Sequence, residues 1–150
     1  VFVGDGSYLL HNSDIYSSIL YDKKLIIIVC DNGGHMVINR LQLAKGGKEY
    51  LCNLRAAGAT NMQFVNFEAH AKSMGANAET VKSVSDLEAA FKRAKESKKT
   101  YVICIETHGY EWLEGSAFWE SPTLEVHSTN ENKTAYEDFI DGKKKQRKGV

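Results

Sequence analysis

Two short clusters in the sequence combine oxygen-bearing side chains with glycines. The first is Gly4-Asp5-Gly6, and the second is Asp31-Asn32-Gly33-Gly34, which places Asn32 twenty-seven positions after Asp5. Mg²⁺ prefers oxygen ligands, usually one or two carboxylates completed by phosphate and water, and glycine lets the backbone approach a ligand closely. The clusters therefore predict a cradle for a magnesium-bound diphosphate, with side-chain oxygens from Asp5 and Asn32 and backbone carbonyls from Gly33-Gly34.

Two other interpretations of these clusters remain open. Gly4-Asp5-Gly6 supplies the first two glycines of the dinucleotide-binding fingerprint G-x-G-x-x-G, whose last glycine is replaced here by Leu9, and Asp31 could act as the ribose-binding acid. A carboxylate between the glycines would repel a pyrophosphate unless a divalent cation lay between them, which favours the magnesium site. Each cluster taken alone is also compatible with a tight turn.

Both clusters follow apolar segments with the composition of buried strands. Val1–Val3 precedes the first cluster, and Leu25–Cys30, apolar at every position, precedes the second. Thr100–Glu106 is predicted to be another buried strand, and Ala78–Val84 an edge strand. Strands that alternate with helices predict an α/β fold with a parallel sheet flanked by helices. Such sheets bind ligands at the carboxyl ends of their strands, where both clusters would lie.

Helical periodicity and end signals predict helices between these strands. The first begins near Ser7, so its free N–H groups would point toward the phosphates. Ala44–Thr60, rich in glycine and charge, is predicted to be a long loop. The predicted helices are Tyr8–Tyr21, Met36–Leu43, Asn66–Met74 with Gly75 as its stop, and a helix from the capping box Ser85-Asp86-Leu87-Glu88 to about Ser97.

Residues 1–128 are predicted to form one diphosphate-binding α/β domain, and residues 129–150 a polar C-terminal tail. Because the chain opens in the middle of a strand, the domain is predicted to be truncated at its N-terminus. The basic run Lys143–Lys148 is interpreted as part of a solvated, frayed terminus. Asn132-Lys133-Thr134 matches a glycosylation acceptor, but the sequence gives it no secretory context.

The composition excludes several classes of protein. The chain has 150 residues, of which 43% are hydrophobic and 25% charged, with a formal net charge of zero. We therefore expect no nucleic-acid partner and no membrane partner. The three cysteines form neither a disulfide framework nor a zinc site, and they predict a reduced, cytoplasmic protein. The absence of a G-x-S-x-G elbow and of a Walker A motif argues against a serine hydrolase and a P-loop nucleotidase.

The two clusters together resemble the signature of thiamine diphosphate enzymes, a GDG followed by NN. The resemblance implies that Asp5, the Asn32 side chain and the Gly34 carbonyl bind Mg²⁺. The sequence departs from the signature at Asp31, which replaces the first Asn, and at His35, where an aromatic residue is common. The resemblance also implies which residues hold the cofactor. The implied cofactor-binding residues are Gly4, Gly6, Ser7, Asn32, Gly34, His35 and Met36.

Within that family, the chain is most similar to the alicyclic 1,2-dione hydrolases, over roughly Val1 to Glu106. These are trihydroxycyclohexane-1,2-dione hydrolase and cyclohexane-1,2-dione hydrolase, and the similarity includes Gly4–Leu9, Asp31–Gly34 and Ile38–Gln42. It implies a thiamine diphosphate- and magnesium-dependent hydrolase that cleaves a carbon–carbon bond of a cyclic 1,2-dione, in inositol catabolism or alicyclic degradation. Acetolactate synthase and the 2-keto acid decarboxylases share the same cradle. Ile38 stands where some decarboxylases have a catalytic glutamate, which weakens the decarboxylase alternative.

The resemblance also implies partners outside these 150 residues. The glutamate that activates the cofactor lies in a pyrimidine-binding domain of the same or another subunit, so we expect a homodimer or homotetramer. Some relatives hold FAD in a central domain. Within the chain, Asn39 is the candidate catalytic residue because its amide could point at the substrate, and solvation on a helix surface is the alternative. A non-catalytic module that binds magnesium with a phosphate or nucleotide remains the other class of function.

Overall fold

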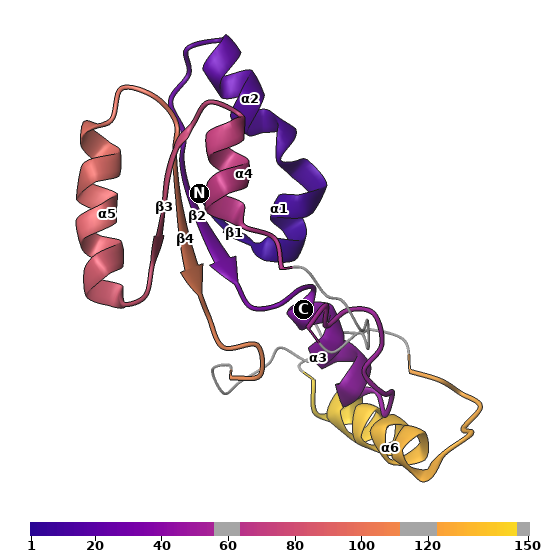
Figure 1. The fold of residues 1–150 in the computed structure, drawn as a ribbon. Coiled ribbons are helices and arrows are strands. Elements are labelled where there is room, and N and C mark those ends of the chain that lie inside the picture. The colour runs from indigo at the N-terminus through magenta and orange to yellow at the C-terminus, as the bar shows by residue number, and fades with distance from the viewer. Residues whose placement is uncertain (56–63, 112–122, 147–150) are drawn as a thin grey trace.

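The computed structural model describes residues 1–55, 64–111 and 123–146, and its centre is a parallel sheet (Figure 1). Hydrogen bonds join the strands in the order β1-β2-β4-β3, and every neighbouring pair is parallel. The predicted α/β fold with a parallel sheet flanked by helices is therefore confirmed. The strands are β1 (Phe2–Gly4), β2 (Ile26–Asp31), β3 (Asn77–Val81) and β4 (Tyr101–Glu106).

The two central strands, β2 and β4, are the most buried part of the sheet. Val29 in β2 and Ile103 in β4 are completely buried, as their apolar sequences predict. The prediction of a buried first strand is wrong, because β1 lies at an edge and has only β2 beside it among the described strands. Phe2 is consequently 72% exposed. β3 is the other edge strand, as predicted, although it ends at Val81.

Helices cover both faces of the sheet (Figure 1). The sheet therefore separates the hydrophobic core into two clusters, one on each face. One core cluster joins Tyr8, Ile15 and Phe67 to the β2 residues Ile27 and Val29. The other joins helix α5 to the opposite face of the sheet through Ala90 and Ala94. The helices on the first face are α1 (Asp5–His11), α2 (Ser13–Leu20) and α4 (Phe67–Ser73), and α5 (Val84–Glu96) lies on the second.

Two predicted helix boundaries differ from the structure. The helix expected over Tyr8–Tyr21 begins at Asp5 and is divided into α1 and α2 at Asn12. The Asn12 side chain donates to the Leu9 carbonyl at 3.2 Å and so competes with the backbone for that acceptor. Helix α5 is capped by Ser83 rather than Ser85, because Ser83 has an extended backbone and its hydroxyl accepts the Asp86 N–H at 3.1 Å.

Two other helices were located correctly from the sequence. Helix α3 (Met36–Ala44) follows the second glycine cluster directly. In α4, the Asn66 side chain accepts the Ala69 N–H at 2.9 Å, which is the predicted N-cap. Gly75 has a φ of +91° just beyond the end of this helix, a conformation that favours glycine and stops the helix.

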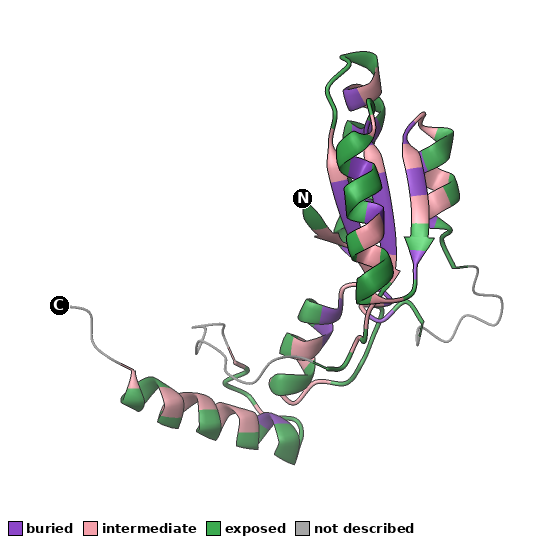
Figure 2. Cartoon of the chain, turned by 90° about the vertical axis from the view of Figure 1, so that its left-hand side faces the viewer, coloured by how far each residue is buried: buried purple, intermediate pink, exposed green. Residues whose placement is uncertain are grey.

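The C-terminal region is helical where a polar, frayed tail was predicted. Asn130–Lys145 forms helix α6, whose first turn is capped when the Thr129 hydroxyl accepts the Asn132 N–H at 3.2 Å. The Asn132 side chain is buried and donates to the carbonyls of Lys45 and Gly46 at 3.3 Å and 2.9 Å. Burial argues against its glycosylation. Most of α6 is exposed or half-buried, and it lies with α3 beyond the carboxyl ends of the strands (Figure 2).

The fold makes one stability prediction, which concerns Glu79. The Arg93 guanidinium donates to both Glu79 carboxylate oxygens, at 3.0 Å and 2.6 Å, and the Tyr101 hydroxyl donates to one of them at 2.6 Å. The Arg93 hydrogen bonds hold the pKa of Glu79 below its ordinary 4.5. We expect Glu79→Gln to lower the melting temperature at pH 7 by about 2 °C. Glu88→Gln on the exposed side of α5 is the control.

The effect of Glu79 should depend on pH in one direction. Because its folded-state pKa is lowered, the carboxylate contributes stability above its ordinary pKa and loses it as the pH falls through the folded-state pKa. Melting curves of the wild type and Glu79→Gln should therefore differ at neutral pH and converge in acid. A difference that persists unchanged below that pKa would contradict the assignment.

Candidate functional site

The two glycine clusters lie side by side because their strands are neighbours. β1 and β2 pair in parallel with Gly4 opposite Cys30, so Asp5 and Asn32 both leave the sheet at the same edge. The Asp5 carboxylate accepts the Asn32 backbone N–H at 3.4 Å. The proximity that the sequence predicts for these two residues is therefore present in the fold.

Three polar groups converge between the clusters in an arrangement that fits a divalent cation. When the Asn32 NH₂ group faces the cradle, it donates to Asp5 Oδ1 at 3.0 Å and to the Gly34 carbonyl at 3.1 Å. Rotation of the amide by 180° puts its oxygen in that place. Adjacent oxygen ligands of an octahedral Mg²⁺, with bonds near 2.1 Å, are about 3 Å apart. The Asn32 amide oxygen therefore has ligand-like spacing to both Asp5 Oδ1 and the Gly34 carbonyl, and these three groups are the candidate protein ligands of the cation.

The position of the Gly34 carbonyl depends on a segment distant in sequence. Gly34 has a φ of +139° and forms an antiparallel bridge with Asn53. The His35 N–H donates to the Cys52 carbonyl at 2.8 Å, and the Leu54 N–H donates to the Gly33 carbonyl at 2.9 Å. A Cβ atom on Gly34 would lie 2.5 Å from the Cys52 carbonyl oxygen, so a larger residue would displace this backbone.

Asp5 is an unusual residue for a protein interior. It is 3% exposed, although it is the first residue of helix α1. Burial raises its pKa above 3.8, and the negative charge of Asp31 raises it further, while hydrogen bonds from backbone N–H groups act in the opposite direction. A bound cation would offset the cost of this buried charge.

The predicted cofactor-binding residues surround this site in different ways. Gly6 lies against the His35 ring, since a Cβ atom there would be 2.6 Å from His35 Nδ1. Ser7 is exposed in the first turn of α1, where backbone N–H groups have no partner within the helix. Gly4 ends β1 next to Asp5, and no atom within 4 Å of an added Cβ would require glycine there. Met36 is buried, 2% exposed.

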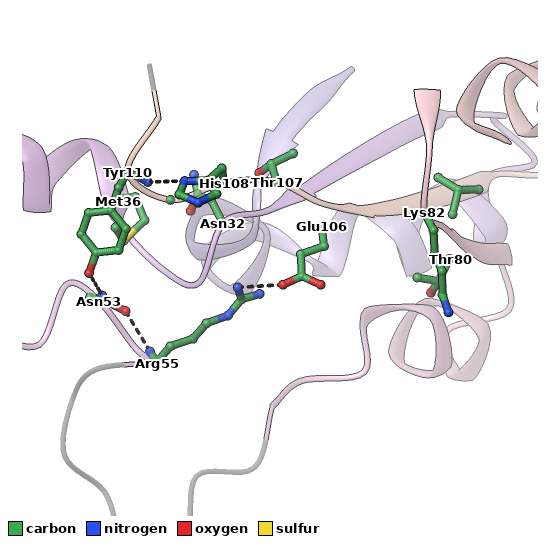
Figure 3. Close-up of a pocket in the computed structure, with 12 residues that line it drawn as sticks. Asn32, Met36, Asn53, Arg55, Thr80, Lys82, Glu106, Thr107, His108 and Tyr110 are labelled. Atoms are coloured by element: carbon green, nitrogen blue, oxygen red, sulfur yellow. Dashed lines mark hydrogen bonds and ion pairs between the residues drawn. The ribbon is translucent and has the colours of Figure 1, made fainter. Parts of the chain in front are cut away.

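A cavity of about 840 Å³ opens beside Asn32 at the carboxyl ends of β2, β3 and β4 (Figure 3). Figure 3 shows Asn32 and Met36 on one side of it, with Thr80 and Lys82 from the end of β3 at the other. The segment after β4 contributes Thr107, His108 and Tyr110. Open α/β sheets bind ligands at this edge, so the cavity is the natural extension of the oxygen cluster.

Asn39 is not on a solvated helix surface, and that alternative is wrong. The residue is completely buried, and its Nδ2 donates to Glu49 Oε1 at 2.6 Å. Its Oδ1 has no hydrogen-bond partner among the described residues. Glu49 Oε1 also accepts a hydrogen bond from the Tyr110 hydroxyl at 2.7 Å and one from the Asn53 side-chain Nδ2 at 3.4 Å. The Tyr110 hydrogen bond is the main cause of a lowered Glu49 pKa.

Sequence reasoning did not identify Glu49, Asn53, Arg55 or Tyr110. The first three lie in the segment predicted only as a long loop, and Tyr110 in the stretch after the last strand. The Arg55 guanidinium contacts Asp31 at 3.1 Å and Glu106 at 3.0 Å. No local pattern could have found these residues, because each acts through a partner more than nine positions away.

The described ranges, 1–55, 64–111 and 123–146, also bear on the kind of metal and on membrane insertion. They contain no group of three His, Cys, Asp or Glu side chains that could hold a metal, so the Asp5 site has one carboxylate and neutral oxygens. That ligand set suits Mg²⁺ better than zinc. No helix among them is long and apolar enough to span a bilayer.

The buried charge of Asp5 leads to a testable prediction for the metal-free chain. Because its folded-state pKa is raised, the wild type loses stability as the pH rises from 3.8 through that pKa. Asp5→Asn keeps the shape and removes the charge, so we expect its melting temperature at pH 7 to rise by about 2–4 °C. Asp138→Asn on exposed α6 is the control. A lower melting temperature for Asp5→Asn, measured by circular dichroism, would contradict this account.

Comparisons with known proteins agree with this geometry. Residues 1–105 match the family described as thiamine pyrophosphate enzyme, C-terminal TPP binding domain. The 3D-(3,5/4)-trihydroxycyclohexane-1,2-dione hydrolase of Halalkalibacterium halodurans is 33% identical over 141 residues, covering 90% of this chain and 21% of that protein. Its counterpart in Listeria monocytogenes is 33% identical over 137 residues, with coverages of 91% and 21%. The chain thus spans about a fifth of the length of these curated relatives.

Solved structures of the same fold include two decarboxylases. The thiamine diphosphate-dependent 4-hydroxybenzoylformate decarboxylase of Rhodococcus jostii superposes with a TM-score of 0.62 at 20% identity, over 71% of this chain and 19% of that one. Benzoylformate decarboxylase from Polynucleobacter necessarius gives 0.58 at 19% identity, over 72% and 19%. At these identities the likeness concerns the fold alone. The family match over most of the chain shows that this protein belongs to the thiamine pyrophosphate enzymes and contains their C-terminal TPP-binding domain.

Proposed function

We propose that this chain is the diphosphate-binding part of a magnesium- and thiamine diphosphate-dependent hydrolase that cleaves a carbon–carbon bond of a cyclic 1,2-dione. The observation that carries the proposal is the convergence of Asp5 Oδ1, the Asn32 amide and the Gly34 carbonyl at distances near 3 Å. The choice of substrate class rests on relatives named as trihydroxycyclohexane-1,2-dione hydrolases.

In this proposal the chain's own residues bind and orient the cofactor. Asp5, Asn32 and Gly34 would hold Mg²⁺, and its positive charge would offset the negative charges of the buried Asp5 carboxylate and of the diphosphate. Gly6 and Ser7, in the first turn of α1, would hold the diphosphate at the N-terminal end of that helix. When bound, the cofactor supplies a carbanion that can add to a carbonyl group.

The cavity beside Asn32 supports a polar, oxygen-rich substrate. Asn53 and Tyr110 line it, and the Asn53 amide donates to the Tyr110 hydroxyl at 2.6 Å. Thr107 and His108 add further groups that can hydrogen-bond to carbonyl or hydroxyl oxygens. Among the described residues, the Asn39 side chain reaches this network through Glu49, so in the proposal it orients the network and does not contact substrate.

The proposal includes a second domain that completes the site. Val37 and Ile38 on α3 are 69% and 54% exposed directly after the cradle, an apolar surface that a partner would cover. We assign this partner as the pyrimidine-binding domain of the same or another subunit, within a homodimer or homotetramer. The free thiols of Cys30, Cys52 and Cys104 suit a reducing, cytoplasmic location.

Ile38 separates this proposal from the decarboxylase alternative. Its side chain cannot ionise, so it cannot replace the glutamate that some decarboxylases carry at this position. The solved decarboxylase structures do not favour that chemistry, since they resemble this chain at 20% identity or less.

Calorimetric titration of the 150-residue chain with thiamine diphosphate tests the proposed cofactor site. We expect binding with Mg²⁺ and an affinity lower by about tenfold or more without it or in Asp5→Ala. Asp138→Ala, a carboxylate removed from exposed α6, should bind like the wild type. Binding that ignores Mg²⁺ or survives Asp5→Ala would refute the proposal. Binding of a magnesium nucleotide in place of thiamine diphosphate would favour the non-catalytic module.

The substrate class requires the complete site. With the chain joined to its pyrimidine-binding domain, Mg²⁺ and thiamine diphosphate, we expect hydrolytic ring opening of a cyclic 1,2-dione, measured as acid released by pH-stat titration. Pyruvate and benzoylformate, decarboxylase-type substrates, should give no CO₂. Release of CO₂ from either without ring opening would overturn the choice of substrate while leaving the cofactor site intact.

A further inference from the structure

Arg55 joins two carboxylates at the carboxyl ends of the central strands. Its Nη2 lies 3.1 Å from Asp31 Oδ1, and its Nη1 lies 3.0 Å from Glu106 Oε1 (Figure 3 shows the second pair). Asp31 and Glu106 are register partners, at the ends of β2 and β4. Like charges directly opposite each other in a sheet repel, so the guanidinium between them removes a local conflict.

The same arginine is attached to the loop that carries the metal-ligand candidates. Asp31 Oδ1, which accepts from Arg55, also accepts the Gly33 N–H at 3.1 Å. A Cβ atom on Gly33 would lie 2.9 Å from Arg55 Cδ, so the side chain passes close to this backbone. The Arg55 backbone N–H donates to Asn53 Oδ1 at 3.0 Å, and Asn53 is the bridge partner of Gly34. Arg55 therefore contacts both segments joined by the Gly34–Asn53 bridge, at Gly33 on one side and at Asn53 on the other.

Charge gives these contacts a consequence for ligand binding. Asp31 directly precedes Asn32, and its charge acts on the buried Asp5 carboxylate. With Glu106, the edge of the sheet holds three carboxylates where an anionic diphosphate is proposed to bind. A guanidinium paired with Asp31 and Glu106 lowers the negative potential that this anion would meet.

We propose that Arg55 is a positioning residue of the cradle: it neutralises Asp31 and Glu106 and thereby keeps the Gly33–Gly34 backbone and Asn32 in place for the ligand. This inference rests on the proposed function for the identity of that ligand. The structural part of the inference, that Arg55 keeps Gly33–Gly34 attached to the segment around Asn53, does not depend on the proposed function. The forked guanidinium can contact both carboxylates at once, which a lysine ammonium on one flexible stem does less well.

The test compares variants of the full chain by two measurements. Hydrogen exchange at the His35 and Leu54 amides reports the bridge, because these N–H groups donate to Cys52 and Gly33. Calorimetry at saturating Mg²⁺ reports the affinity for thiamine diphosphate. The variants are Arg55→Met, Asp31→Asn and their combination. Arg93→Met is the control, since it removes a guanidinium that also pairs with a carboxylate, Glu79, but joins α5 to β3 and has no hydrogen bond to Gly33 or Asn53 among the described residues.

We expect Arg55→Met to speed exchange at both amides by about tenfold and to weaken thiamine diphosphate binding by about fivefold or more. Asp31→Asn keeps an acceptor for the Gly33 N–H and removes the Asp31 charge. In the double variant, both the exchange rates and the thiamine diphosphate affinity should therefore return to within about twofold of the wild-type values. Arg93→Met should leave both measurements unchanged.

Two results would overturn the proposal. One is wild-type exchange and affinity in Arg55→Met, and the other is a loss that Asp31→Asn does not rescue, which would make Arg55 a packing residue. If Arg55→Met does not fold, the double variant tests the proposal. It must fold, and it must keep wild-type exchange at the His35 and Leu54 amides and wild-type affinity for thiamine diphosphate. If the wild type itself fails to bind thiamine diphosphate, the proposed function fails, and the exchange measurements still decide whether Arg55 holds the loop.

Discussion

The parallel pairing of β1 with β2 is the constraint on which the site depends. It sets Gly4 opposite Cys30, and the chain leaves both strands at the same edge, so Asp5 and Asn32 meet although 27 positions separate them. The pairing in turn depends on the apolar centre of the sheet, where Val29 and Ile103 are completely buried. Helices on both faces supply that burial, and the site lies just outside it.

The buried charge at the candidate site lowers the free energy of unfolding of the metal-free chain. Asp5 is buried, and Asp31 is near enough for its charge to disfavour ionisation of Asp5. Polar oxygens that converge without a cation are a cost that a purely structural sheet edge would avoid. A site of this kind is expected where binding matters more than local stability. The Arg55 contacts with Asp31 and Glu106 limit the cost on one side of the cradle.

The segment from Lys45 to Arg55 shows how a loop can be part of a site without any motif of its own. Its backbone pairs with Gly33–His35, its Glu49 collects hydrogen bonds from Asn39, Asn53 and Tyr110, and its glycine carbonyl at Gly46 receives the buried Asn132 of α6. These contacts connect α3, the segment after β4 and the C-terminal helix at one end of the sheet. Long irregular segments in compact domains often serve binding in this way.

Sequence alone determined the fold class, the strands Leu25–Cys30 and Thr100–Glu106, and the proximity of Asp5 and Asn32. Buried strands and glycine clusters can be recognised in the sequence because each is formed by a few consecutive residues. Tertiary structure decided the rest. Phe2 is exposed because β1 is an edge strand, and Asn39 is buried because Glu49 receives its amide. The role of Arg55 depends on two carboxylates that meet only when β2 and β4 pair. Such long-range contacts leave no periodicity in the sequence, so only the folded chain reveals them.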